Sequence, residues 1–115
     1  MRRMMLAVAL AALSLSAAYA EDVMASRYGN TTLATDAKGV QTKVYYQADG
    51  TLTAKQGDMN YSGTWKVANG QVCLTFKSAA PDGMTNPFCA MVMAHKVGDT
   101  WKSGDRTITL LKGIQ

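Results

Sequence analysis

Apolar and polar residues alternate in short runs along most of the chain after residue 30, and the runs end at Gly, Asp or Asn. Alternation with a period of two is typical of strands that bury one face, because successive side chains point to opposite sides. Turn residues at short intervals favour antiparallel neighbours. The pattern predicts strands at residues 31–35, 40–47, 51–55, 63–68, 71–76, 88–95, 100–102 and 107–112.

The strongest hairpin signal is the Asn-Gly pair at residues 69–70, which separates two alternating runs. A type I′ turn needs positive φ at both central residues, and Asn and Gly tolerate that conformation best. With this pair as the loop, Trp65 lies opposite Leu74. One face of the hairpin then consists of large apolar side chains and is expected to be core: Tyr61, Trp65, Val67, Val72, Leu74 and Phe76.

The turn at Asp49-Gly50 fixes the register of an earlier pair of strands. A three-residue loop with Gly50 in the left-handed position places Leu52 opposite Tyr46, whereas a two-residue loop places it opposite Gln47. We prefer the first, because it gathers the apolar side chains on one face. That expected face consists of Val40, Val44, Tyr46 and Leu52.

The chain has two cysteines, Cys73 and Cys89. If the loop at residues 77–85 is centred near Pro81, these cysteines lie opposite each other on neighbouring strands. The register therefore predicts a disulfide, which would stabilise a small domain by roughly 3 kcal/mol. A redox-active pair is disfavoured, because catalytic dithiols usually have Cys-x-x-Cys spacing.

The expected fold is all-β: a small antiparallel meander or a lipocalin-like barrel of roughly seven to eight short strands with one disulfide. No segment after residue 20 has a convincing helical pattern. Closing the sheet removes its exposed edges, which is why short sequential strands favour a barrel.

Residues 1–20 are expected to be a signal peptide. Arg2 and Arg3 form a basic start, an apolar run follows at residues 6–15, and Ala-Tyr-Ala at 18–20 resembles a cleavage site. The alternative is an uncut membrane anchor, although the run is short for a span. The expected organisation is a signal peptide (1–20), an N-terminal arm (21–29) that is free or a lead-in strand, and a single β domain (30–115), in a periplasmic or secreted protein.

Charge argues against a nucleic-acid partner. The chain has 12 Lys and Arg residues against 8 Asp and Glu, a formal net charge of +4. Two of the basic residues lie in the predicted signal peptide, so cleavage leaves 10 basic against 8 acidic residues, a net charge of +2. These charges are scattered and form no basic stripe. We expect no nucleic-acid binding and no stable membrane span after cleavage.

Residues for catalysis are sparse, and we expect no enzyme activity. His95 is the sole histidine, and a triad would need turn residues such as Ser103 and Asp99 beside it. The Asp residues lie in turns next to Gly or Asn, where they favour local hydrogen bonds to the backbone. No phosphate-binding glycine loop, calcium loop or zinc-type cluster is present in the sequence, and no cofactor is expected.

Met91, Met93 and His95 form the one unusual local motif. On a strand they would share a face, with successive side chains about 7 Å apart. Two thioethers and an imidazole are soft ligands that suit Cu(I) or Ag(I). The motif resembles the Met, His and Trp arrangement of small periplasmic copper-efflux metallochaperones, which implies Trp65 or Trp101 as a capping ring. The alternative is that both methionines fill space under a loop or form a partner surface.

The stretch around the two cysteines resembles bacterial inhibitors of serralysin-type metalloproteases. The residues that carry the resemblance are Gly63-x-Trp65, the two cysteines, a late Trp101 and the run at 108–111. The resemblance implies an exported, single-disulfide, eight-stranded barrel whose N-terminal trunk enters a protease cleft. Residues 21–29 are the only candidate for that trunk.

The sequence therefore favours an exported protein that binds rather than catalyses. A protein-binding or protease-inhibitor-like module would need an accessible arm and an exposed apolar patch around Met91 and Met93. A Cu(I) or Ag(I) protein would need those methionines and His95 to converge. A small-molecule carrier would need a cavity lined by large side chains: Tyr46, Trp65, Phe76, Phe88 and Trp101.

Overall fold

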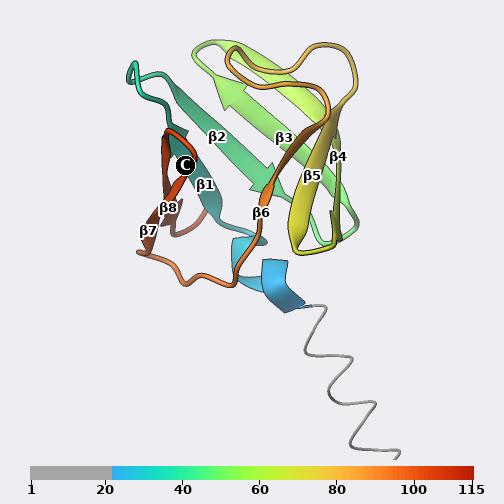
Figure 1. Cartoon of the computed structure of the whole chain (residues 1–115), viewed down its shortest axis with the longest axis vertical. Helices are drawn as coiled ribbons and strands as arrows, with labels where there is room; N and C mark the ends of the chain where they lie inside the picture. Colours follow the sequence, from blue (N-terminus) through green and yellow to red (C-terminus); the bar gives the residue numbers. More distant parts are fainter. Residues whose placement is uncertain (1–21) are drawn as a thin grey trace, which may run out of the picture.

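The structure, a computed structural model, describes residues 22–115, and the predicted signal peptide lies outside them. Eight strands form one antiparallel sheet in the order β6-β5-β4-β3-β2-β1-β8-β7, which curls into a nearly closed barrel (Figure 1). The predicted all-β fold is confirmed. The elements are η1 (Asp22–Arg27), β1 (Thr31–Thr35), β2 (Gln41–Tyr46), β3 (Thr51–Gln56), β4 (Met59–Ala68), β5 (Gln71–Phe76), β6 (Phe88–Met91), β7 (Thr100–Ser103) and β8 (Arg106–Leu111).

The predicted registers of two hairpins are confirmed. Trp65 pairs with Leu74 across the β4–β5 turn, where the Asn-Gly pair at 69–70 has positive φ at both residues. Leu52 pairs with Tyr46 across the β2–β3 turn, as the three-residue loop requires. Short turns with the correct handedness therefore set the pairing of the central strands.

The expectation that Val40 belongs to the apolar face is wrong. Val40 precedes β2 and is 40% exposed. Its main-chain N–H donates to Asp36 Oδ1 at 2.9 Å, and its carbonyl accepts from the N–H of Asp36 at 3.0 Å. These bonds hold Val40 in the turn, because an Asp side chain at a turn competes successfully for nearby backbone donors.

One barrel wall is packed so tightly that only glycine fits at position 63 of β4. A Cβ built on Gly63 would lie 2.1 Å from the carbonyl oxygen of Thr75 on β5. The neighbouring Trp65 donates from its indole Nε1 to the carbonyl of Gln47 at 2.9 Å. The barrel core consists of side chains from several strands and from η1: Met24, Val44, Tyr46, Leu52, Ala54, Val72, Leu74 and Phe76.

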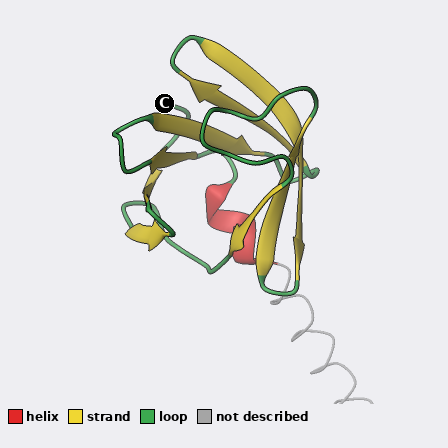
Figure 2. Cartoon of the chain, turned by 45° about the horizontal axis from the view of Figure 1, so that its top comes forward, coloured by secondary structure: helices red, strands yellow, loops and turns green. Residues whose placement is uncertain are grey.

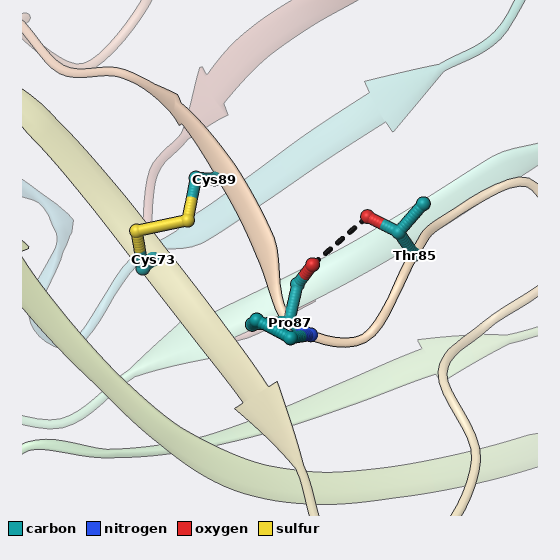
Figure 3. Close-up of a disulfide and its surroundings, with 4 residues drawn as sticks. All are labelled: Cys73, Thr85, Pro87 and Cys89. Carbon is teal, nitrogen blue, oxygen red and sulfur yellow. Dashed lines mark hydrogen bonds between the residues drawn. A yellow bond between two sulfur atoms is a disulfide. The ribbon is translucent and has the colours of Figure 1, made fainter.

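The predicted disulfide is present, and it joins β5 to β6 (Figure 3). Cys73 lies directly opposite Cys89, with 4.0 Å between their Cα atoms. The chain between these strands is held by Asn86, whose side-chain amide bonds both the N–H and the carbonyl of Phe76. The covalent bond and this amide together fix the position of β6.

Residues 22–27 form a 3-10 helix, η1, at one end of the barrel (Figure 2), where we predicted a free arm or a lead-in strand. Met24 is 1% exposed and belongs to the core. Burying this apolar side chain fixes the segment, which a pattern with no clear period did not indicate. Among the described residues, no helix has the length and apolarity needed to cross a membrane.

Candidate functional site

The barrel has one open seam, between β6 and β7, which are the two ends of the sheet order. The Cα separation of 4.0 Å between Cys73 and Cys89 identifies them as a non-hydrogen-bonded pair of the β5–β6 ladder. The N–H and C=O of Cys89 therefore point away from β5 and into the seam. The N–H and C=O of Met91, two residues further along β6, also point into the seam.

The unpaired edge of β7 faces the seam from the opposite side. Ser103 and Arg106 flank a two-residue turn and so form a hydrogen-bonded pair. By alternation, Thr100 and Lys102 direct their main-chain N–H and C=O away from β8 and toward the seam. No main-chain hydrogen bond joins β6 to β7 in the described chain. Two strand edges with unused donors and acceptors thus face each other.

Side chains, not a ladder, bridge the seam at its two ends. At one end, Arg106 from β8 places its guanidinium carbon 5.0 Å from the ring centroid of Phe88 on β6, and it donates to the carbonyl of Gly83. At the other end, Arg27 of η1 donates to the carbonyl of Met93 at 3.1 Å, and Ser26 donates to the carbonyl of His95 at 2.5 Å. These contacts connect β6 and the segment after it to β8 and η1.

A surface groove of about 500 Å³ lies along the seam and has walls from β6, β7 and the segment between them. Met91 is 78% exposed and Met93 is 64% exposed. Exposed methionines are adaptable and are frequent in surfaces that bind partners. The side chains that line this groove include Phe88, Met91, Met93, His95, Trp101, Lys102 and Arg106.

His95 and Trp101 form a stacked pair in the groove wall. Their ring centroids are 3.5 Å apart and the rings are tilted by 6°. His95 Nδ1 lies 3.5 Å from Asp99 Oδ2, and the N–H of Lys96 donates to the same oxygen at 2.9 Å. The Lys96 hydrogen bond, with a smaller contribution from His95, keeps the pKa of Asp99 below its usual range. The pair thus has a defined orientation.

The three residues predicted as soft-metal ligands all line this groove. The expectation that they share one strand is wrong, because β6 ends at Met91. The chain leaves the sheet there, since the carbonyls of Met93 and His95 bond to η1 instead of to a strand. Among residues 22–115, no group of three or more His, Cys, Asp or Glu side chains is placed to hold a metal ion.

A cavity of about 80 Å³ lies inside the barrel beneath the groove. Of the large residues predicted to line an internal cavity, Tyr46, Phe88 and Trp101 do so; Trp65 and Phe76 are not among its lining residues. The wall also contains Arg27 and Thr32, both buried, which the sequence did not single out.

Two polar groups in this wall are unusual. Thr32 Oγ1 is buried and has no hydrogen-bond partner among the described residues. Burial raises the pKa of Tyr46 from its ordinary value of 10.0 to about 12, with a smaller opposing effect of Arg27. The phenol is therefore protonated at neutral pH and well into the alkaline range. Thr and Tyr are common in strands, so their presence in alternating runs did not identify Thr32 and Tyr46 as candidate site residues.

A scan against protein-family models and a search of the curated proteins find no match for this chain. The functional interpretation therefore depends on the seam and on the cavity beneath it. The resemblance to metalloprotease inhibitors stays a prediction. Its trunk candidate, residues 21–29, includes η1, whose Met24 is packed in the core.

Proposed function

We propose that this protein is an exported, non-enzymatic binding protein that accepts an extended peptide segment of a partner protein in the seam between β6 and β7. The observation that carries this proposal is the pair of unused strand edges facing one groove. An extended segment gains main-chain hydrogen bonds by joining an exposed edge, and adjacent pockets then select its side chains. The disulfide supports an oxidising compartment, as expected for the periplasm or the exterior.

The chemistry of the groove specifies which segment fits best. Met91 and Met93 offer exposed apolar surface, which suits aliphatic or aromatic side chains of the partner. Among residues 23–115, the groove wall contains two basic side chains, Lys102 and Arg106, and one acidic side chain, Asp105. Charge complementarity therefore favours a segment with an acidic residue beside its apolar ones.

The test is selection of linear peptides from a random library on the protein comprising residues 21–115, followed by NMR with each selected peptide. We expect amide shifts at Cys89, Met91, Thr100 and Lys102. N-methylation of either alternate set of peptide N–H groups should weaken binding, because one set faces β6 and the other faces β7. Undiminished binding by both methylated peptides, or shifts confined to another face, would rule out strand addition.

A second candidate function is Cu(I) or Ag(I) binding, favoured by the presence of Met91, Met93 and His95 in the lining of one groove, together with Trp101. Titration with Ag(I) should then shift the methyl signals of both methionines and the indole signal at one equivalent. Met93→Leu should weaken the response, whereas Met59→Leu, at a similarly exposed methionine on β4, should not. Identical titrations for the two variants would exclude this site.

A further inference from the structure

The cavity inside the barrel contains a buried positive charge. Arg27 is 5% exposed, and its guanidinium carbon lies 5.6 Å from the ring centroid of Trp101. Two of its N–H groups donate to the carbonyls of Val23 and Met93 at 3.1 Å each. No carboxylate among residues 23–115 is within ion-pair distance of it. A buried guanidinium keeps its charge, so an anion that reached it would be strongly favoured.

The other polar groups of the cavity wall are suited to the same kind of ligand. Thr32 has an unpaired hydroxyl at 7% exposure, and Tyr46 has a protonated phenol. Arg106 adds a second cation, and no Asp or Glu among residues 23–115 lines the cavity. The wall therefore offers several donors and two positive charges. An ionised carboxylate, which only accepts hydrogen bonds, complements this set.

We propose that this cavity binds the carboxylate of a small aliphatic monocarboxylate, with Arg27 and Thr32 contacting its oxygens. The apolar remainder of the lining, such as Val44, Leu74 and Ile108, would surround the hydrocarbon part. This proposal does not depend on peptide binding in the seam, because the groups involved lie inside the barrel.

The size of the cavity limits the ligand. Its volume of about 80 Å³ is smaller than the roughly 150 Å³ engineered cavity that holds benzene. A two-carbon to four-carbon acid is therefore the expected occupant. Phe88, Ala90, Met91 and Trp101 line both the cavity and the groove, so a longer tail would leave through the seam.

The experiment is NMR titration of the protein comprising residues 21–115 with acetate, butyrate and octanoate, observing the side-chain Nε–H of Arg27 and the indole N–H of Trp101. We expect saturable shifts with butyrate and none with butanol or butyramide at the same concentrations. Equal responses to butyrate and butanol would show a merely apolar cavity and overturn the proposal. Equal responses to butyrate and chloride would overturn it as well.

Thr32→Val tests the same contact without removing the charge. It deletes a hydroxyl that has no partner and preserves the shape of the side chain, so the free protein should be at least as stable as the parent. Butyrate affinity should fall roughly tenfold. Thr53→Val, at an exposed position of β3, is the matched control and should leave the affinity unchanged. Unchanged affinity in Thr32→Val would contradict the assigned contact.

The carboxylate has two possible sources, a free acid or the C-terminus of a peptide. Peptides selected on the seam should be compared with their C-terminally amidated forms. Loss of the Arg27 shift on amidation, with the seam amide shifts retained, would assign the cavity to a peptide terminus. A response to butyrate alone would assign it to free acids. Arg27 silent to both would overturn the proposal, even if strand addition at the seam were observed.

Discussion

The imidazole of His95 lies flat against the indole of Trp101, with ring centroids 3.5 Å apart and the planes tilted by 6°. This contact fixes the segment between β6 and β7 to the wall of the groove, because His95 follows β6 and Trp101 belongs to β7. Ser26 of η1 also holds this segment, by donating to the carbonyl of His95.

Replacing His95 with Ala should release this stack. The free energy of unfolding should fall by about 1 kcal/mol, as for other aromatic pairs. The indole N–H signal of Trp101 should move, because the ring current of the imidazole is lost, while that of Trp65 stays in place. Urea denaturation and an NMR spectrum check both effects. An unchanged Trp101 signal would contradict the stacked geometry.

The orientation of the two seam edges predicts a pattern of hydrogen exchange. The amides of Cys89, Met91, Thr100 and Lys102 point into the seam and should exchange quickly. The amide of Ala90 bonds to β5 and the amide of Trp101 bonds to β8, so both should be protected from exchange. Protection at all these positions would show that β6 and β7 are paired in solution and that the barrel is closed.

The buried phenol of Tyr46 predicts loss of stability at high pH. Its pKa is about 12 in the folded protein and near 10.0 when unfolded, so the folded state holds the proton more tightly. This contribution is fully present below pH 10 and falls between pH 10 and 12, by up to roughly 3 kcal/mol. Denaturation at several pH values should show this fall, and Tyr46→Phe should remove it. A parallel decline in the variant would assign the effect to other groups.

Gly63→Ala should be severely destabilising. The added Cβ would lie 2.1 Å from the carbonyl oxygen of Thr75, so the backbone of β4 or β5 must move. We expect a loss of about 3 kcal/mol or more, measured by chemical denaturation. Ser62→Ala, at the adjacent exposed position, should change stability by no more than about 0.5 kcal/mol. A mild effect at Gly63 would mean that the two strands separate easily.

Local chemistry explains which features of the fold were predictable. The Asn-Gly pair at 69–70 and the loop ending in Gly50 define the registers of their hairpins, because turn geometry couples directly to strand pairing. The Cys73–Cys89 pairing follows from centring the loop at residues 77–85 near Pro81, which places the two cysteines opposite each other. Each of these predictions involves residues close in sequence, where backbone conformation and side-chain alternation are sufficient.

The candidate site was only partly predictable. Met91, Met93 and His95 were recognisable as a motif, and they do line one groove. The sequence did not indicate that the chain leaves the strand after Met91. This departure depends on η1, because Arg27 and Ser26 donate hydrogen bonds to the carbonyls of residues 93 and 95. These hydrogen bonds join residues more than sixty positions apart. No local pattern encodes such a pairing.

The sequence by itself determined the all-β class, the hairpin registers and the disulfide, since alternation and turn chemistry act over a few neighbouring residues. Only the tertiary structure decided that the barrel stays open between β6 and β7, and that Arg27 and Thr32 face the same internal cavity. The physical reason is that closure and burial depend on how distant segments share space. A buried charge and an unpaired hydroxyl indicate a ligand site only when the fold places them in the wall of one cavity.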